Sequence, residues 1–367
     1  MRHRVLHVIT GLGIGGAEQQ LRLLLRHLPA ACEVVTLTNP GPVADGIRAD
    51  GTPVTHLGMT GNRDLTALPR LTALIRAGRY DVVHTHLYRA CVYGRVAARL
   101  AGVRAVVATE HSLGDSQIEG RPLTRGTRAL YRGTERLGTS TLAVSATVAQ
   151  RLRAWGVPAP RVHVVPNGID PAPFRFAPAA RAATRAQLGL SRDAFVVGGV
   201  GRLVPGKSFD TLVRAVAATP GAHLLLAGDG PERAVLRALA AKLHASGRVH
   251  LVGATSDVPA LLAAMDVFVS PCREEAFGLA VVEALASGLP VLHVSCPAID
   301  DLPASHAPGA HRIGTTQQDL VSALRAQLEA GPRRLPVPPA VDGYHIAHTA
   351  DRVMALYATA LASARKK

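Results

Sequence analysis

Short runs rich in β-branched residues alternate along this chain with longer segments of helical spacing. Such alternation is typical of βα units, which build a mostly parallel sheet covered by helices. In the first part of the chain the expected strands are Val5–Thr10, Glu33–Thr38, Pro53–Leu57, Asp81–Leu87, Ala105–Glu110 and Thr141–Ser145. The pattern restarts near Ala194, and the strands expected there are Phe195–Arg202, Ala222–Gly228, Arg248–Gly253, Asp266–Ser270 and Pro290–Ser295. Because the alternation restarts once, we predict an α/β protein of two similar domains.

Turn-forming and helix-breaking residues are dense between the two series. Val165–Pro171 is followed by two further prolines, Pro173 and Pro178, which suits a connection between domains. Near the end of the chain, apolar residues recur with helical spacing after a proline-rich stretch at Gly331–Pro339. These features predict a first domain at 1–165, a linker at 166–178, a second domain at 179–343 and a C-terminal helix at 344–367 that packs back on the first domain.

Composition narrows the class of protein. The 367 residues suffice for two or three domains, and the 48% hydrophobic and 18% charged residues argue against disordered and collagen-like chains. No apolar run approaches the roughly 20 residues that span a bilayer, so we expect neither a signal peptide nor a spanning helix. Four widely separated cysteines, without a CxxC pair, predict a reduced cytoplasmic protein with neither a disulfide framework nor a zinc site.

A glycine-rich turn, Gly11–Gly16, follows the first expected strand and fits the pattern GxGxxG. A dinucleotide site would also need an acidic residue about 20 positions further on, at the end of the second strand. That strand ends at Thr38 without a carboxylate. The turn is therefore interpreted as backbone N–H groups at a helix start that approach an anion or a sugar, and an ordinary tight βα turn is the alternative.

Two cations follow the first strand of the second series. Arg202 and Lys207 lie in the turn after it, at the carboxyl end of a parallel strand, where open α/β sheets bind ligands. Fixed Arg and Lys side chains would stabilise the charge that develops on a nucleotide diphosphate when its bond to a sugar breaks. A pair of solvated surface cations is the alternative.

Two glutamates eight residues apart, Glu275 and Glu283, form a second candidate constellation. If a helix starts at Gly278, then Glu275 lies in the loop before it and Glu283 about one turn inside it. One carboxylate can then reach a sugar and the other a ribose, while the free N–H groups at the helix start can meet hydroxyls or phosphate. The neighbouring Glu274 is expected to be solvated or turn-forming.

The ordered motifs resemble family 4 of the retaining, nucleotide-sugar-dependent glycosyltransferases. The resemblance covers nearly the whole chain and rests on Gly15–Glu18, Pro166–Asp170, Gly201–Lys207, Gly228–Glu232 and Glu275–Ala284. It implies the GT-B fold, in which two Rossmann-like β/α/β domains face each other across a deep cleft and a C-terminal helix crosses back to the first domain. The first domain would shape the acceptor site and the second would bind the donor.

The resemblance also implies roles for single residues. Arg202 and Lys207 would contact the diphosphate, and Glu275 the hydroxyls of the donor sugar. Glu283 would bind the ribose hydroxyls, and His111, which follows the fifth expected strand, would contact the donor sugar. The remaining donor-binding residues would come from the glycine turn, from two loops near the nucleobase and from the second glutamate block: Gly15, Gly16, Gly228, Gly253, Phe277, Gly278 and Leu279.

The sequence departs from the family pattern at two places. Ala276 stands where the family usually has glycine, so the backbone there must accept a Cβ atom. The segment Ser295–Pro303 lacks the paired-glycine turn common in the family, which puts phosphate contacts from it in doubt. Most histidines, including His84 and His86 on the fourth expected strand, are interpreted as structural or surface residues.

A double-displacement mechanism would need two carboxylates about 5 Å apart around the anomeric carbon, and the sequence supplies no evident partner for Glu275. The resemblance instead implies front-face transfer with retention. The sequence contains no DxD motif, so we expect neither an obligatory metal nor a further cofactor. The expected reaction moves a sugar from a nucleotide diphosphate, preferably a UDP-sugar, to a hydroxyl of a glycan, lipid-linked or natural-product acceptor. A nucleotide-sugar epimerase, a glycan phosphorylase and a non-catalytic nucleotide-sugar-binding protein remain the alternatives.

The net charge of +15 is concentrated in the first part of the chain. Residues 1–165 contain 21 basic and 10 acidic side chains, and residues 166–367 contain 20 and 16. Five arginines recur at intervals typical of one helix face: Arg121, Arg125, Arg128, Arg132 and Arg136. Such a stripe suits anionic lipid headgroups at the inner face of the plasma membrane or a phosphate-bearing acceptor, and a solvated face is the alternative. Nucleic acid is not expected, because aromatic residues make up only 4% and no recognition motif accompanies the charge.

Overall fold

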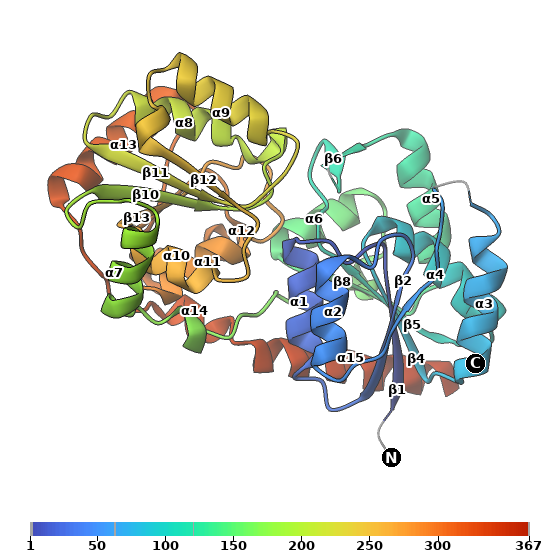
Figure 1. Ribbon diagram of the computed structural model, residues 1–367. Helices are drawn as coiled ribbons and strands as arrows, with labels where there is room; N and C mark the ends of the chain where they lie inside the picture. Colours follow the sequence, from blue (N-terminus) through green and yellow to red (C-terminus); the bar gives the residue numbers. More distant parts are fainter. Residues whose placement is uncertain (1–2, 62–63, 120, 366–367) are drawn as a thin grey trace. The chain divides into compact units, whose positions relative to one another are not determined.

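The computed structural model describes residues 3–61, 64–119 and 121–365. The chain forms two compact units (Figure 1). The first unit comprises Met1–Gly168 together with Ile346–Lys367, and the second comprises Ile169–His345. The division after Gly168 falls inside the segment expected as a linker, and the last helix starts at Ile346, two residues later than expected.

A parallel sheet forms the centre of the first unit, with the strand order β3-β2-β1-β4-β5-β8-β9. Its strands are β1 (Arg4–Ile9), β2 (Ala31–Thr36), β3 (Val54–His56), β4 (Val82–His86), β5 (Ala105–Glu110), β8 (Ser140–Ala143) and β9 (Val162–Val164). The helices are α1 (Gly16–Leu25), α2 (Gly41–Ala49), α3 (Ala67–Gly78), α4 (Tyr88–Leu100), α5 (Arg125–Glu135), α6 (Ala146–Ala154) and α15 (Ile346–Arg365).

Successive residues of β1 enter different parts of the core, because side chains alternate between the two faces of a strand. Leu6 and Val8 pack in a cluster that also contains residues of α3 and α4. Val5, on the opposite face, packs with residues of α1 and α15. The sheet of the first unit is therefore covered on both faces, and α15 supplies part of one cover although it follows the second unit in the sequence.

The second unit has its own parallel sheet, with the strand order β12-β11-β10-β13-β14-β15. Its strands are β10 (Phe195–Val200), β11 (Ala222–Ala227), β12 (Val249–Gly253), β13 (Val267–Ser270), β14 (Val291–His293) and β15 (Ala310–Arg312). The helices are α7 (Pro178–Gln187), α8 (Phe209–Ala217), α9 (Arg233–Lys242), α10 (Val258–Ala264), α11 (Leu279–Ala286), α12 (Pro297–Asp300), α13 (Gln317–Ala330) and α14 (Pro339–Gly343).

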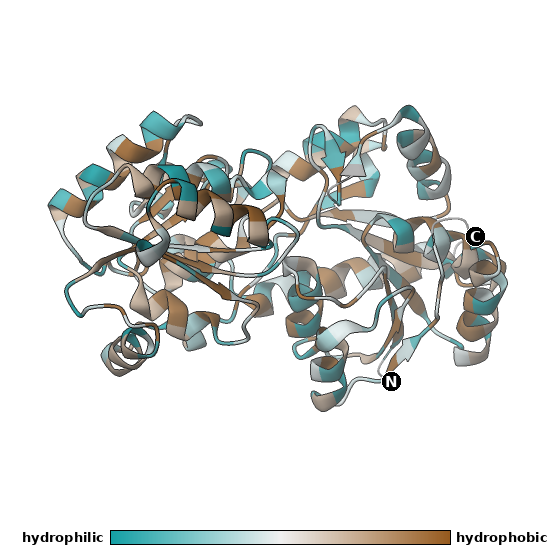
Figure 2. Cartoon of the chain, turned by 45° about the horizontal axis from the view of Figure 1, so that its top comes forward, coloured by the Kyte–Doolittle hydropathy of each residue, from teal (hydrophilic) through white to brown (hydrophobic). Residues whose placement is uncertain are grey.

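Hydropathy follows this architecture in both units. Figure 2 shows hydrophobic strands inside each unit and helices with one hydrophobic and one hydrophilic side. That distribution is expected where helices cover a sheet, since each helix buries only one stripe. In the described part of the chain, no helix combines the length and the apolar character needed to cross a membrane.

The predicted strands were placed correctly, but several were too long at their carboxyl ends. The strand expected at Phe195–Arg202, for example, ends at Val200, because Gly201 turns the chain with a φ of 157°. The short strands β9 and β15 were not predicted. Each has three residues and lies at an edge of its sheet.

The arginine-rich segment corrects one prediction. Arg121 is not on the helix, because residues 121–122 form β7 (Arg121–Pro122), which pairs with β6 (Gln117–Ile118) as an antiparallel hairpin. The side chain of Arg121 lies outside the described part of the structure. Thr124 starts α5 by accepting a hydrogen bond from the backbone N–H of Thr127. The helix therefore carries Arg125, Arg128 and Arg132, with Arg136 as its C-terminal cap residue.

Candidate active site

Two loops at the carboxyl edge of the second sheet are packed backbone against backbone. Leu203, in the loop after β10, donates its backbone N–H to the carbonyl of Asp229 in the loop after β11. A Cβ atom at Gly228 would lie 1.9 Å from the carbonyl oxygen of Gly201, and one at Gly230 would lie 2.3 Å from that of Leu203. Both glycines also have positive φ angles, 135° and 159°. Only glycine therefore fits these two positions without movement of the backbone.

Lys207 and Glu275 form an ion pair beside these loops. Lys207 ends the short 3-10 helix η3 (Pro205–Lys207), and Glu275 lies in the loop between β13 and α11. Lys207 Nζ donates a hydrogen bond of 2.5 Å to Glu275 Oε2, and their side chains are 29% and 17% exposed. The pair joins the loops that follow β10 and β13, which are neighbouring strands.

The environment keeps both members of this pair charged. Burial by itself would lower the pKa of Lys207 and raise that of Glu275. Burial is the largest single influence on each group, but the partner's opposite charge and the hydrogen bonds around the pair together outweigh it, so the pKa of Lys207 lies above its ordinary value and that of Glu275 below. At neutral pH the site therefore holds a fixed ammonium and a fixed carboxylate.

Two further hydrogen bonds hold the charged pair in place, and a third charge lies nearby. The Cys272 thiol donates a hydrogen bond to the carbonyl of Gly206, which ties the loop after β13 to the residue before Lys207. Ala276, at the position where glycine was expected from the resemblance, donates its backbone N–H to Glu275 Oε1. Arg202 is exposed in the same turn and close enough for its charge to act on the pKa of Lys207.

The helix α11 begins where the sequence indicated. Gly278 is its N-cap residue with a φ of 106°, so the first N–H groups of the helix have no capping side chain from this residue. A Cβ atom at Gly278 would lie 2.4 Å from Cys296 Sγ. Glu283 lies in the second turn and is half-buried, and burial raises its pKa to about 7. No hydrogen bond or ion pair from the described residues holds its carboxylate.

The other donor-binding candidates of the second unit lie at the same edge of the sheet. Gly228, after β11, donates its N–H to the carbonyl of Gly253 at the end of β12. Phe277 is buried and packs edge-on against Tyr344, with ring centroids 5.1 Å apart, and Leu279 is the first residue of α11. The carboxyl ends of β10, β11, β12 and β13 thus gather the candidates, as expected for a ligand site in an open α/β sheet.

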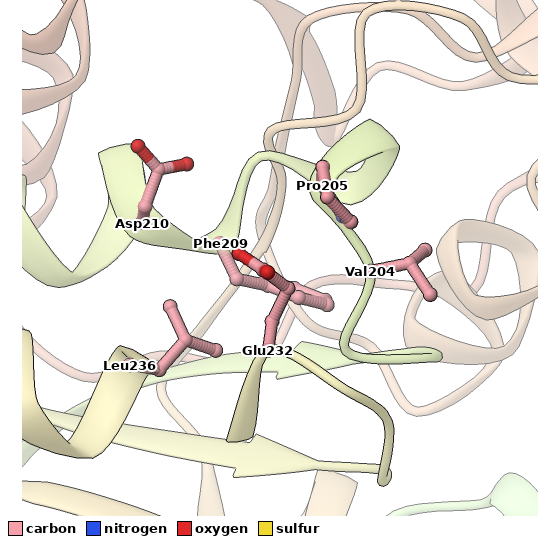
Figure 3. Close-up of a pocket in the computed structure, with 6 residues that line it drawn as sticks. All are labelled: Val204, Pro205, Phe209, Asp210, Glu232 and Leu236. Atoms are coloured by element: carbon pink, nitrogen blue, oxygen red, sulfur yellow. The ribbon is translucent and has the colours of Figure 1, made fainter. Parts of the chain in front are cut away.

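A small hollow lies near the Arg202–Lys207 turn. Figure 3 shows its lining, which consists of Val204, Pro205, Phe209, Asp210, Glu232 and Leu236. It contains two carboxylates and no cation, so its charge does not suit a diphosphate. The charged pair, and not this hollow, is the candidate anion site of the second unit.

In the first unit, the candidates follow the carboxyl ends of β1 and β5. Gly15 is the N-cap residue of α1 and Gly16 is its first residue. Their turn packs against Gly41, where a Cβ atom would lie 2.3 Å from the carbonyl oxygen of Leu12. His111 follows β5 and is 9% exposed, and burial lowers its pKa to about 4. The close packing of Gly41 against Leu12 was not predicted, because nothing near Gly41 in the sequence indicates it.

Comparisons with known proteins identify the family. Residues 14–173 match the family model described as Glycosyltransferase Family 4, and residues 180–335 match the model described as Glycosyl transferases group 1. The chain is 32% identical to the GDP-mannose-dependent alpha-mannosyltransferase of Mycobacterium tuberculosis over 309 residues. These residues cover 81% of this chain and 79% of that protein. The chain belongs to glycosyltransferase family 4.

A second relative is the UDP-Gal:alpha-D-GlcNAc-diphosphoundecaprenol alpha-1,3-galactosyltransferase of Escherichia coli. It is 31% identical over 264 residues, which cover 68% of this chain and 66% of that protein. The match to lipopolysaccharide core biosynthesis glycosyltransferase LpsE of Rhizobium meliloti reaches 46% identity over 111 residues, but it covers only 30% of this chain and 33% of that protein.

Solved structures show the same fold. Anabaena Alr3699/HepE in complex with UDP and glucose superposes with a TM-score of 0.84 at 20% identity, covering 98% of this chain and 100% of that chain. WaaG, a glycosyltransferase involved in lipopolysaccharide biosynthesis, superposes with a TM-score of 0.67 at 17% identity, covering 98% of both chains. The two α/β units therefore have the GT-B fold that the sequence predicted.

Proposed function

We propose that this protein transfers a sugar from a nucleotide diphosphate donor to an acceptor hydroxyl, with retention of configuration and without an obligatory metal. The observation that carries the proposal is the Lys207–Glu275 ion pair beside Arg202, at the ligand-binding edge of the second sheet. Membership in glycosyltransferase family 4 favours transfer over the epimerase, phosphorylase and binding-protein alternatives.

The proposed mechanism assigns each charge a step. Lys207 and Arg202 bind the diphosphate, and their positive charge stabilises it most when the bond to the anomeric carbon has broken and the electron pair has moved to the diphosphate oxygen. An ammonium has three N–H groups, so Lys207 can bond Glu275 and a phosphate at once. Glu275 accepts hydrogen bonds from the sugar hydroxyls. The acceptor hydroxyl attacks the anomeric carbon from the face on which the diphosphate departs, and the departing diphosphate takes the proton of that hydroxyl.

Uridine is the proposed nucleobase. The relative from Escherichia coli is named for UDP-Gal, whereas the mannosyltransferase of Mycobacterium tuberculosis is named for GDP-mannose. Thermal-shift titration of the protein with UDP, GDP and ADP compares its binding to the three nucleoside diphosphates. A larger shift with UDP than with GDP is expected, and the reverse order would reject uridine.

Transfer itself is tested with labelled donor and analysis of the product. We expect a glycoside whose anomeric configuration matches that of the donor, as read by NMR, and unchanged turnover after EDTA treatment. An inverted product would reject front-face transfer, activity lost to EDTA and restored by Mg²⁺ would reject metal independence, and an epimerised nucleotide sugar would reject the reaction class.

The proposed acceptor is lipid-linked and reached at an anionic membrane surface. Arg125, Arg132 and Arg136 are exposed on or at the end of α5, and none of them forms an ion pair with a described residue. Leu130 on the same helix is 51% exposed. Arg125, Arg132 and Arg136 follow one another at intervals of seven and four residues, so they share one face of α5, and Leu130 lies on another side of the helix. A row of exposed arginines on one helix face suits the headgroup region of anionic lipids.

Co-sedimentation with liposomes tests the membrane proposal. The triple variant Arg125→Gln, Arg132→Gln, Arg136→Gln should lose binding to vesicles that contain anionic lipid. A matched control replaces three exposed arginines of the second unit by glutamine, at Arg192, Arg214 and Arg237, and should bind like the natural protein. Equal binding by both triple variants would reject α5 as the membrane-contacting element.

A further inference from the structure

A row of buried histidines crosses the sheet of the first unit. His7 lies on β1, His84 and His86 lie on β4, and His111 follows β5. The first three are at most 1% exposed. His7 Nδ1 lies 3.0 Å from His86 Nε2, and His86 Nδ1 lies 3.2 Å from His111 Nε2. The three imidazoles His7, His86 and His111 thus form one continuous hydrogen-bonded chain, named here the histidine chain.

A metal ion is the first alternative explanation for this cluster. One nitrogen from each of His7, His84 and His86 lies within 4.8 Å of the others. However, both nitrogens of His84 are already bonded, at 2.6 Å to the Tyr357 hydroxyl and at 2.7 Å to the Thr109 hydroxyl. Both nitrogens of His86 are bonded within the histidine chain. A metal would have to break these bonds, so the arrangement favours a hydrogen-bonded function.

Each imidazole of the histidine chain carries one proton at neutral pH. Burial lowers the pKa of His7 to about 3 and that of His111 to about 4, and it lowers the pKa of His86 well below its ordinary value. A neutral imidazole has one N–H donor and one bare acceptor nitrogen. The protons must therefore all sit on Nδ1 or all on Nε2 if both hydrogen bonds are to form.

The two ends of the histidine chain differ, and this difference selects one direction. His7 Nε2 and His111 Nδ1 are both buried without a hydrogen-bond partner. A buried, unpaired N–H group is costlier than an unpaired acceptor. With the protons on Nε2, the unpaired N–H would be that of His7 in the core, whereas with the protons on Nδ1 it would be that of His111 in a pocket, where a ligand can satisfy it.

The pocket at the end of the histidine chain lies within the first unit and has a mostly apolar lining with a few polar side chains. Its lining includes His111, Gln20 of α1, Asn167 and Thr349 of α15. The side chain of Gln20 is 4% exposed, and neither its amide oxygen nor its amide nitrogen has a hydrogen-bond partner. Buried polar groups normally find partners, so the unpaired amide is a second, independent sign that the pocket takes a polar ligand.

We propose that His7 and His86 are positioning residues that hold His111 in the tautomer with the proton on Nδ1, so that His111 donates a hydrogen bond to a ligand hydroxyl in this pocket. The proposal rests on the proposed function only in identifying that hydroxyl as one of the donor sugar. The Gln20 amide, which can both donate and accept, would bond the same ligand.

Nitrogen-15 NMR of the full chain labelled at histidine tests the proposal without any substrate. Signals are assigned with single variants of the three histidines. The expected spectrum shows His7, His86 and His111 protonated at Nδ1, the opposite of the form that free imidazole side chains prefer in water. Protonation of His111 at Nε2, or one equivalent of tightly bound zinc in the purified protein, would overturn the proposal. Because the free protein is observed, this result stands apart from success or failure of the transferase assignment.

Two variants of His7 provide a functional readout. His7→Asn keeps an amide N–H where Nδ1 donates to His86, and His7→Leu removes the donor. We expect His7→Leu to give a mixture of His111 tautomers and to raise the KM for the nucleotide sugar roughly three- to tenfold, as for the loss of one hydrogen bond, whereas His7→Asn keeps the natural tautomer and KM. Identical tautomers and KM values in both variants would overturn the positioning role, and if either variant misfolds, the spectrum of the natural protein decides.

Discussion

Lys207 and Glu275 hold each other before any ligand arrives. The short hydrogen bond and the mutual pKa shifts mean that neither group must be reorganised when a diphosphate and a sugar bind. Preorganised charge of this kind is the largest single contribution to many enzymatic rate enhancements. In this account, Lys207 acts on the leaving group and Glu275 acts on the sugar, so their removal should have different signatures.

Glu275→Gln should separate these two functions. The substitution removes a negative charge beside the diphosphate, so affinity for a nucleoside diphosphate should stay equal or increase. Affinity for the nucleotide sugar should fall, and kcat should fall about 100-fold, as when one preorganised polar group of an active site is removed. Calorimetric titration with both ligands, together with initial rates, checks this. A parallel loss of affinity for both ligands would contradict the assignment of Glu275 to the sugar.

Glu283 should make donor binding dependent on pH. Burial raises its pKa to about 7 from an ordinary value of 4.5, and the ionised form is the better acceptor for ribose hydroxyls. Affinity for a nucleotide sugar, whose phosphates do not titrate between pH 6 and 8, should therefore rise over this range in the natural protein and stay flat in Glu283→Gln. A flat profile in both proteins would remove Glu283 from the ribose site.

The same shift has a consequence for stability. The pKa of the Glu283 carboxyl is higher in the folded protein, about 7, than in the unfolded chain, 4.5. Its contribution to stability is therefore fully present below pH 4.5 and is lost as the pH rises through about 7. The Tm of the natural protein should thus fall relative to that of Glu283→Gln between pH 5 and 8. A constant difference in Tm across this range would contradict the raised pKa.

The positions of single site residues in the fold were predictable where the residues stand in ordered motifs, and their roles stay predictions. Arg202, Lys207, Glu275 and Gly278 stand in ordered motifs, and the structure places them on neighbouring loops. The histidine chain was not predicted, because its contacts run between three strands that are far apart in sequence. One signal was available: His84 and His86 are two residues apart on a strand, so they face the same side of the sheet.

At the scale of elements, the loops after β10 and β11 depend on glycine. In Gly228→Ala the new Cβ would meet the Gly201 carbonyl, and the φ of 135° would be strained. We expect a loss of stability of about 1–3 kcal/mol. Nucleotide binding should also weaken, because the Arg202–Lys207 turn is held by this contact. Thermal unfolding and nucleotide titration measure both effects.

Gly247→Ala is the matched control, because a Cβ atom there meets nothing within 4 Å. It should leave both the Tm and the nucleotide affinity close to those of the natural protein. If Gly228→Ala behaved like Gly247→Ala, the backbone contact between the two loops would not be what holds the turn.

Element positions followed from the alternation of apolar runs, but their ends did not. Strand and helix boundaries depend on single contacts, such as the pairing of β6 with β7 that removes Arg121 from the arginine-rich helix. The cap at Thr124 is an ordinary N-cap signal, and it could have indicated that α5 starts after Arg121. Gly126 and Gly133 have low helix propensity, yet both lie inside the continuous helix α5.

At the scale of the whole molecule, the first unit is discontinuous in sequence. Ile346, Val353 and Tyr357 of α15 are buried in the same cluster as Val5 and Val82 of the central strands. The restart of the βα pattern predicted two domains, and the helical spacing near the end predicted a helix that returns to the first of them. The first unit should therefore lose stability when the end of the chain is altered.

Val353→Asp tests this connection. A carboxylate at this buried position should destabilise the first unit by about 3 kcal/mol. Trp155 is the one tryptophan of the chain and packs against Tyr131 in the first unit, so its fluorescence reports the unfolding of that unit. The control Ala355→Asp places the same charge at an exposed position of the same helix and should leave the fluorescence transition unchanged. Equal transitions in both variants would contradict the packing of α15 on the first unit.

The most direct test of the account is the affinity of Lys207→Met for a nucleoside diphosphate, measured by calorimetry beside the exposed-arginine control Arg237→Gln. At least a tenfold loss of affinity, or about 1.4 kcal/mol, is expected, with transfer abolished, while Arg237→Gln behaves like the natural protein. Natural affinity and turnover in Lys207→Met would contradict the claim that this ammonium stabilises the departing diphosphate.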